Sequence, residues 1–232
     1  MSDHAYGAAV LPRVAAVLAA AEISPDKVGD TRAEVLGEEE RALYHWILRR
    51  FASSGRPSME AVAAEADRLG LDLERALATL AREDLLHRGG DGEIAVAYPF
   101  SGRATAHRVR FPSGHEEYAM CALDALGIAA MFEQAVEIAS RDPLTDAEIR
   151  ARLSPDGACE SVPGSAVVVT GTTVAHGPES SSSCCPVLSF FASADNAERW
   201  LSAQSEVRGH VVSIADAAAA GRAVFGGVLD RS

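Results

Sequence analysis

The segment from Glu116 to Ser140 constrains the fold more than any other part of the sequence. Its composition predicts a helix, and apolar residues cover most of the circumference of that helix: Cys121, Leu123, Leu126, Ile128 and Met131. A helix without a polar face is expected inside a protein core. The chain has 232 residues, 48% of them apolar, and is therefore long enough to bury such a helix.

Residues 32–112 are predicted to form a winged-helix-like module. Apolar residues at helical spacing indicate three helices, which cover residues 32–52, residues 57–69 and a stretch that begins after Asp72. Two extended segments follow, residues 93–100 and 105–111, and they are expected to pair as a wing hairpin. This order of helices and hairpin is the order found in a winged helix.

Residues 113–232 are predicted to form a mixed α/β domain with a small sheet. Residue types that favour strands indicate three of them: Ser165–Val169, Val187–Phe191 and His210–Ile214. A helix over Asp195–Ala203 is expected, with Ser193 as its N-cap, and the serine-rich segment Gly177–Ser183 is expected to be a loop. With residues 1–31 as an N-terminal helix and extension, the predicted fold class is α+β, the winged-helix-like module packing on the C-terminal domain.

The charge of the chain argues against a nucleic-acid or membrane partner. Lys and Arg number 21 and Asp and Glu number 33, for a formal net charge of −12, which repels phosphate backbones and anionic lipid surfaces. The apolar run Val14–Ala21 is shorter than the ~20 residues that span a bilayer. Residues 56–110 hold eight arginines, no lysine and nine acidic residues, so a scaffold role is favoured over DNA recognition for the module.

The four cysteines indicate functional thiols in a reducing cytoplasm rather than a disulfide framework. Cys184 and Cys185 are adjacent, which is a poor arrangement for structural bridges. None of the seven histidines stands at zinc-ligand spacing from a cysteine or from another histidine. No cofactor is therefore expected.

The sequence places a thiol and a carboxyl group together at Cys121 and Asp124. Residues three apart on a helix lie on the same face, with Cβ atoms ~5–6 Å apart, so these two groups can share a proton. A second thiol is available from Cys184 or Cys185, where the serine-rich loop meets a predicted strand. Cys159 has no inferred partner and is interpreted as incidental.

Two separated motifs resemble the organomercurial (alkylmercury) lyase family. The stretch Tyr118–Asp124 reads Tyr-Ala-Met-Cys-Ala-Leu-Asp and is similar, with one change, to the family signature Tyr-Ala-Trp-Cys-Ala-Leu-Asp. Cys184-Cys185, Phe190–Ser193 and Trp200 resemble a second family block of two cysteines, Phe-Phe-Ala-Ser and tryptophan. The likeness covers roughly residues 32–225 in the same order, and two motifs together are more specific than either alone.

The resemblance implies cleavage of carbon–mercury bonds, with Cys121, Asp124 and Cys184 as the catalytic residues and as the ligands of mercury. Soft thiolates are the protein ligands that Hg(II) prefers, and two of them weaken the carbon–mercury bond by donating electron density. The carbon must receive a proton as it leaves, and a carboxyl group beside the thiols is a suitable general acid. The implied products are a hydrocarbon and Hg(II) bound to two thiolates.

Three departures from the family pattern keep alternatives open. Met120 replaces the usual tryptophan, one extra residue separates the cysteine pair from the phenylalanines, and an accessory cysteine near residues 139–142 is absent. The extra residue makes Cys185 an alternative to Cys184 as the second thiol, although the family's order favours Cys184. The alternative functions are a divergent member that acts on another soft electrophile or metal, and a thiol-based winged-helix regulator.

The setting implied by the resemblance is mercury resistance and detoxification in the cytoplasm. The implied partners are a small organomercurial substrate, cellular thiols, and mercuric reductase as the acceptor of Hg(II). No nucleic acid or membrane is expected as a partner. The chain is expected to be a monomer or a homodimer.

Overall fold

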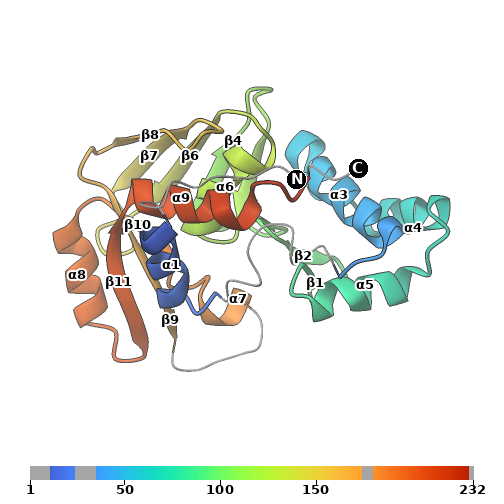
Figure 1. Ribbon diagram of the computed structural model, residues 1–232, viewed down its shortest axis with the longest axis horizontal. Helices are drawn as coiled ribbons and strands as arrows, with labels where there is room; N and C mark the ends of the chain where they lie inside the picture. Colours follow the sequence, from blue (N-terminus) through green and yellow to red (C-terminus); the bar gives the residue numbers. More distant parts are fainter. Residues whose placement is uncertain (1–10, 24–34, 174–179, 230–232) are drawn as a thin grey trace.

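The protein contains two antiparallel sheets around a central helix, with three further helices at one end (Figure 1). The computed structural model describes residues 11–23, 35–173 and 180–229. The helices are α1 (Leu11–Ala20), α3 (Glu38–Ser54), α4 (Met59–Arg68), α5 (Leu73–Arg82), α6 (Ala122–Met131), α7 (Ser180–Ser183), α8 (Ala194–Ser202) and α9 (Ile214–Phe225). The strands are β1 (Leu86–Arg88), β2 (Ile94–Ala97), β3 (Phe100–Ser101), β4 (His107–Arg110), β5 (Glu116–Ala119), β6 (Val136–Arg141), β7 (Glu148–Leu153), β8 (Cys159–Val162), β9 (Val167–Thr173), β10 (Ser189–Phe191) and β11 (Val207–Ser213).

Helices α3, α4 and α5 confirm the three helices predicted near the N-terminus. Helix α3 begins at Glu38, and the predicted start at residue 32 lies outside the described residues. Ser58 and Asp72 cap α4 and α5, because each side chain accepts a hydrogen bond from the backbone N–H three residues further on. The local signals for helix starts were therefore sufficient in this part of the chain.

The predicted wing hairpin between residues 93–100 and 105–111 is wrong. Strand β2 lies between β1 and β3, whereas β4 lies between β5 and β6. Strands β3 and β5 lie between β2 and β4, and β5 falls in the segment that was predicted as a helix. Because β5 pairs with both β3 and β4, the two predicted wing strands do not become neighbours.

The helix predicted over residues 116–140 is shorter than expected, although its burial is confirmed. Only Ala122–Met131 is helical, and strands β5 and β6 precede and follow it. In β6 the buried Val136 and Ile138 alternate with exposed or half-buried residues, which is the period of a strand with one buried face. Nine of the ten residues of α6 are buried, so the apolar circumference does place this helix in the core.

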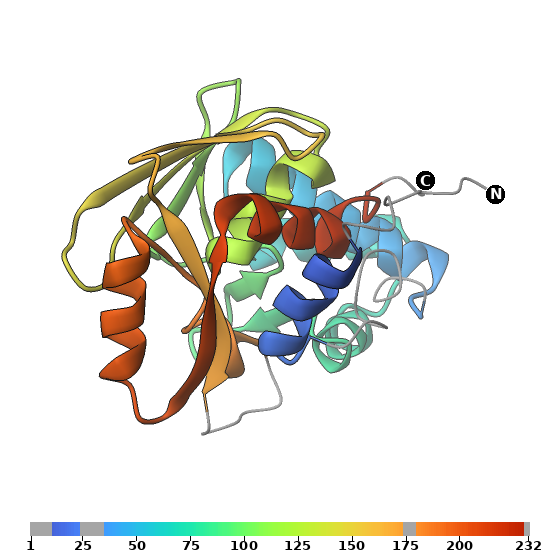
Figure 2. The ribbon, with the colours of Figure 1, turned by 60° about the vertical axis from the view of Figure 1, so that its left-hand side comes forward.

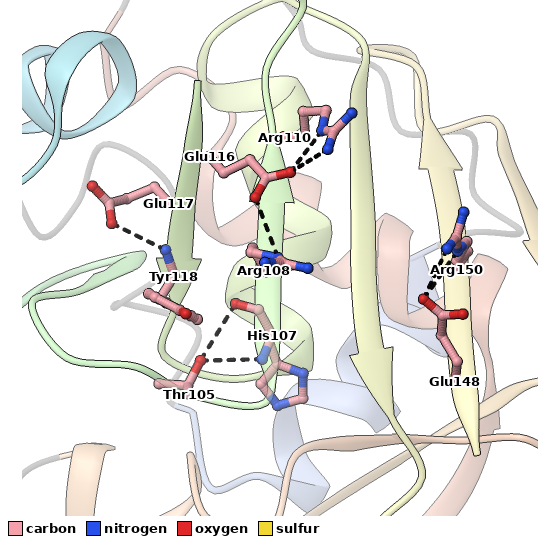
Figure 3. Close-up of polar contacts among 9 residues, drawn as sticks. All are labelled: Thr105, His107, Arg108, Arg110, Glu116, Glu117, Tyr118, Glu148 and Arg150. Carbon is pink, nitrogen blue, oxygen red and sulfur yellow. Dashed lines mark hydrogen bonds and ion pairs between the residues drawn. The ribbon is translucent and has the colours of Figure 1, made fainter. Parts of the chain in front are cut away.

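The larger sheet has eight strands in the order β1-β2-β3-β5-β4-β6-β7-β8, and each neighbouring pair is antiparallel. Buried and exposed residues alternate along β7, so one face of the sheet packs on the core and the other faces outward. On the outer face Glu116 contacts Arg108 and Arg110, and Glu148 contacts Arg150 (Figure 3). The sequence analysis did not predict β6, β7 and β8, and the C-terminal half therefore contains more sheet than expected.

The three strands predicted in the C-terminal part are confirmed, and they form the smaller sheet in the order β10-β9-β11. Helix α8 covers one face of this sheet, and α1 and α9 lie against the other (Figure 2). Val169 and Phe191 pack towards α8 with Ala197, whereas Val168 and Phe190 belong to the main core. The N-cap of α8 is Ser193, as predicted, and its hydroxyl accepts from the Asn196 N–H.

The N-terminal apolar run is part of a packing helix. Val14, Val17 and Leu18 of α1 are buried against α9 and the smaller sheet. The Thr170 hydroxyl of β9 donates to the Val17 carbonyl at 2.9 Å, which fixes α1 on the sheet. In the part of the chain that the structure describes, no helix is long and apolar enough to cross a membrane.

Helices α6 and α9 cross at two glycines. A Cβ atom on Gly127 would lie 2.8 Å from the Gly221 carbonyl oxygen and 2.3 Å from the Phe225 ring, and one on Gly221 would lie 2.8 Å from the Leu123 carbonyl oxygen. Real Cβ atoms do not approach backbone so closely, so the two helices can pack at this distance only with glycine at both positions. The crossing holds α6 in the centre of the core.

We predict that Gly221→Val destabilises the protein by about 3 kcal/mol, because the added side chain overpacks the α6–α9 contact. Urea unfolding followed by circular dichroism measures this change. Gly164→Val is the matched control, since nothing lies within 4 Å of a Cβ atom at that position. Equal stabilities of the two variants would contradict the prediction.

We also predict a loss of stability in mild acid that depends on His107. Burial lowers the pKa of His107 from 6.5 to about 4, and its ring lies 3.0 Å from the Ser140 hydroxyl. In the unfolded chain His107 is protonated near pH 6.5, whereas in the folded protein it is protonated only near pH 4. The free energy of unfolding therefore falls as the pH drops from 6.5 to 4. His107→Gln should reduce that dependence in urea titrations between pH 7 and pH 4, with the remainder due to His45, whose pKa burial also lowers to about 4, whereas the same change at the exposed His210 should not reduce it.

Candidate active site

The thiol of Cys121 caps the central helix. Cys121 stands between β5 and α6 with an extended backbone, and its Sγ accepts a long hydrogen bond of 3.5 Å from the Asp124 N–H. This is the position that serine or aspartate takes at most helix starts. The sulfur therefore lies at the N-terminal end of the helix, where the peptide dipoles favour negative charge, while the residue itself is only 2% exposed.

The carboxyl group of Asp124 lies in the first turn of the same helix and is also buried, with 5% of the residue exposed. A carboxylate in the first turn is favoured by the helix dipole. The three-residue spacing predicted that the thiol of Cys121 and this carboxyl group would share one face of the helix. The structure does bring the two groups together, but through the capping geometry, because Cys121 is the N-cap and not a residue of the helix.

The third group of the cluster is Cys185. It follows the short helix α7 in the segment Gly177–Ser183, which was predicted as a loop. That prediction is wrong for Ser180–Ser183, and residues 177–179 lie outside the described residues. The Cys185 thiol donates to Asp124 Oδ2 at 3.8 Å. The ligand atoms of Cys121, Asp124 and Cys185 all lie within 4.8 Å of one another, and all three residues are buried.

Cys184, the residue that the family's order favoured, is not part of this cluster. Its thiol donates to the Ser180 carbonyl oxygen at 3.7 Å, back towards α7. Adjacent residues in a turn direct their side chains differently, so only one member of the vicinal pair reaches the carboxyl group. Cys159 is half-exposed on β8 and donates to the Glu160 carbonyl oxygen.

The buried thiols are held in their protonated form. Burial raises the pKa of Cys121 to about 12. The pKa of Cys185 lies well above its ordinary value of 9.0 because of its hydrogen bond with Cys121 and its burial. The pKa of Cys184 is raised by its hydrogen bond with Cys185 and by burial. At neutral pH a metal ion must therefore displace protons from these thiols when it binds.

Sequence reasoning missed Tyr98, which lies beside the cluster. Its pKa is raised by burial and then by the charges of Cys185, Asp84 and Asp124, so the phenol stays neutral there. Tyr98 follows β2, a part of the chain assigned to a wing. Nothing in the local sequence marks this tyrosine, because only the folded chain brings the N-terminal helical part next to the cysteine pair.

Two thiols and one carboxyl group, all buried, form a cluster that could hold a metal ion. Hard cations such as Mg²⁺ and Ca²⁺ prefer shells made of oxygen ligands, whereas sulfur ligands select soft metals. The ligand chemistry of the cluster therefore indicates a thiol-based protein that handles a soft metal.

Comparisons with known proteins agree with this class and identify one family within it. The family model described as alkylmercury lyase (MerB) matches residues 100–226. The alkylmercury lyase of Staphylococcus epidermidis is 30% identical over 182 residues, which are 78% of this chain and 80% of the relative. The alkylmercury lyase of Bacillus cereus is 28% identical over 190 residues, which are 80% of this chain and 82% of the relative.

A solved structure confirms the fold class at the level of mixed helices and antiparallel sheets. The crystal structure of the mercury-bound form of MerB2 superposes with a TM-score of 0.67 and 18% identity, and the match covers 94% of this chain and 98% of that one. The chain belongs to the alkylmercury lyase family, as its two motifs predicted. These matches do not favour the alternative of a winged-helix regulator.

We predict that Cys121 reacts with iodoacetamide only slowly at neutral pH and that its rate keeps rising steeply with pH. The thiolate is the reacting species. Because the pKa of Cys121 is about 12, the thiolate population grows about tenfold per pH unit and does not level off near pH 9, the ordinary pKa of a cysteine. Peptide mass spectrometry after labelling between pH 7 and pH 9.5 measures the rate for this residue. The same labelling in urea is the control, and a folded-state rate that levels off below pH 9 would overturn the prediction.

Proposed function

We propose that this protein cleaves the carbon–mercury bond of organomercurials and releases a hydrocarbon and Hg(II). The observation that carries the proposal is the buried cluster of Cys121, Asp124 and Cys185, whose ligand atoms lie within 4.8 Å of one another, in a chain that belongs to the alkylmercury lyase family. Mercury is here the substrate and the product of the reaction rather than a resident cofactor.

The first step is an exchange of ligands at mercury. The Cys121 thiol loses its proton to the departing ligand of the organomercurial, and its sulfur takes that place on mercury. The Cys185 thiol, which already donates to Asp124 Oδ2, then passes its proton to that carboxylate and becomes the second sulfur ligand. Soft sulfur–mercury bonds offset the cost of deprotonating two buried thiols.

The second step breaks the carbon–mercury bond by protonolysis. The carboxyl group of Asp124 now holds the proton that came from Cys185 and stands beside the metal-bound carbon. The electron pair of the carbon–mercury bond takes this proton, so the carbon leaves as a hydrocarbon and no free carbanion forms. Mercury remains as Hg(II) on two thiolates, and Asp124 is again a carboxylate.

The choice of Cys185 as the second thiol has two supports. Its sulfur reaches Asp124, whereas the Cys184 thiol is directed to Ser180. The sequence spacing also favours Cys185. One extra residue separates the cysteine pair from Phe190, so Cys185, and not Cys184, stands as far from the phenylalanines as the first cysteine of the family does. Cys184 stays close enough to Cys185 to accept mercury from the site.

The rest of the chain is assigned supporting roles in this proposal. Residues 113–232, the proposed catalytic domain, carry the chemistry, and the helices α3, α4 and α5 serve as a scaffold. Helix α1, from the N-terminal residues, packs on α9 and the smaller sheet. The four cysteines are free thiols, which fits a reducing cytoplasm. Cellular thiols would then remove Hg(II) from the site by exchange and pass it to a mercuric reductase.

We predict that purified, reduced protein releases benzene from phenylmercury in the presence of excess thiol, and that three variants lose this activity. Cys121→Ser, Asp124→Asn and Cys185→Ser each remove one of the groups that the two steps require, so gas chromatography should show a fall of about a hundredfold or more. Cys159→Ser is the matched control and should keep the rate of the natural protein.

The vicinal pair gives the decisive comparison. Cys184→Ser should retain far more activity than Cys185→Ser, and the reverse result would assign the second sulfur to Cys184. The proposed function itself would be wrong if the natural protein released no more benzene than Cys121→Ser.

A further inference from the structure

A third buried thiol lies beside the cluster and takes no part in the two proposed steps. Cys184 belongs to the same apolar core as Cys121 and Cys185, and it is buried like them. Its thiol is hydrogen-bonded to the Cys185 thiol, and the Cys185 thiol is also hydrogen-bonded to that of Cys121. Cys185 therefore has two neighbouring sulfur atoms, of which the proposed mechanism uses only one.

Cys184 is an addition to the family motif. Because Cys185 stands as far from Phe190 as the family's first cysteine does, the second cysteine of the motif corresponds to Pro186. Cys184 then precedes the reactive thiol, at a position before the motif begins. The family resemblance therefore assigns no role to this residue.

The turn that carries Cys184 and Cys185 is fixed by hydrogen bonds on both sides. The backbone N–H groups of the two cysteines donate to the Ser180 carbonyl oxygen at 3.2 and 3.0 Å. The Cys184 carbonyl oxygen accepts from the Leu188 N–H at 3.1 Å, and the Leu188 carbonyl oxygen accepts from the Ala122 N–H at 2.9 Å. The turn is therefore joined directly to the start of α6, the helix whose N-cap carries the first thiol of the cluster.

Two pairs of thiols thus share the sulfur of Cys185. The first pair is Cys121 and Cys185, which lie with the carboxyl group of Asp124, and the second pair is Cys184 and Cys185. The Cys184 thiol donates to the Ser180 carbonyl oxygen over 3.7 Å, and thiols are weak donors. A bond to a soft metal is much stronger than this contact, so the second pair can also offer two sulfur ligands to Hg(II).

An exchange of sulfur ligands can move Hg(II) from the first pair to the second. The Cys184 sulfur bonds to mercury, the bond between mercury and the Cys121 sulfur breaks, and the proton of the Cys184 thiol passes to the Cys121 sulfur. One mercury–sulfur bond forms as another breaks, and Cys185 holds the metal throughout. The exchange therefore requires no oxidant or reductant, and it leaves the number of thiols unchanged.

We propose that Cys184 and Cys185 form a second binding site for Hg(II), which takes the product over from Cys121 by exchange at the shared Cys185. The role of this site in turnover rests on the proposed function, whereas its capacity to bind Hg(II) does not. The exchange returns the thiol of Cys121 to its free form while mercury is still bound. A cellular thiol then removes mercury from the second pair.

Mercury binding by single cysteine variants tests the second site without any measurement of activity. The variants are Cys121→Ser, Cys184→Ser and Cys185→Ser, and Cys159→Ser is the matched control because Cys159 lies on β8. Each reduced protein is loaded with an equimolar amount of HgCl2 and challenged with rising concentrations of dithiothreitol. Plasma mass spectrometry then measures the mercury that stays on the protein after gel filtration, and circular dichroism checks that each variant is folded.

We expect Cys121→Ser and Cys184→Ser each to retain mercury, because each variant keeps one pair of thiols. Cys185→Ser removes the sulfur that both pairs share, so it should lose its mercury at a dithiothreitol concentration about a hundredfold lower. X-ray absorption of mercury-loaded Cys121→Ser should show a pair of sulfur neighbours around the metal. The second site would be overturned if Cys121→Ser lost mercury as easily as Cys185→Ser, or if it bound the metal through a single sulfur.

Benzene release from phenylmercury at limiting and at excess thiol tests the role of the site in turnover. At limiting thiol, Cys184→Ser should turn over about fivefold more slowly than the natural protein, because its product stays on the first pair until an external thiol removes it. Excess thiol should abolish this difference, and Cys159→Ser should show none. An identical thiol dependence of Cys184→Ser and the natural protein would contradict the role in turnover. If Cys121→Ser retains mercury but the natural protein releases no benzene, only the proposed function fails.

Discussion

The burial of helix α6 is the constraint on which the rest of the structure depends. This helix carries the thiol of Cys121 at its N-cap and the carboxyl group of Asp124 in its first turn. The position of the helix therefore fixes the position of these two groups. The larger sheet packs on it from one side and α9 from another, and the crossing at Gly127 and Gly221 brings α9 to backbone contact. The thiol of Cys121 and the carboxyl group of Asp124 both lie at the start of this helix, where the dipole and the free N–H groups can accommodate them.

This placement is compatible with the proposed exchange of thiol protons for a soft metal ion. Burial keeps the thiols of Cys121 and Cys185 protonated at neutral pH, so they are poor nucleophiles in the free protein. The bond between sulfur and a soft metal is strong enough to offset the loss of those protons. In the proposed mechanism Asp124, which accepts a hydrogen bond from the Cys185 thiol, takes up the proton of that thiol and then donates it to the departing carbon.

The second thiol reaches the helix from a different part of the chain. Cys185 follows the serines of α7 and is buried in the same apolar core as α6. Its backbone N–H donates to the Ser180 carbonyl oxygen, and its thiol donates to Asp124 Oδ2, 61 positions away in the sequence. Two groups of the cluster therefore come from one helix and its cap, and the third comes from a distant segment.

The sequence by itself determined the local features of this protein. Cap residues, helical periodicity and β-branched runs identified α3, α4, α5, α8 and the smaller sheet, and two motifs identified the family. The spacing of Cys121 and Asp124 correctly predicted that their side chains lie together, although Cys121 is the N-cap of the helix and not a residue inside it. Only the tertiary structure decided which strands pair, since β5 separates the two predicted wing strands. It also decided that Cys185 rather than its neighbour reaches the carboxyl group and the thiol of Cys121, because such contacts depend on the path of the whole chain and not on its local pattern.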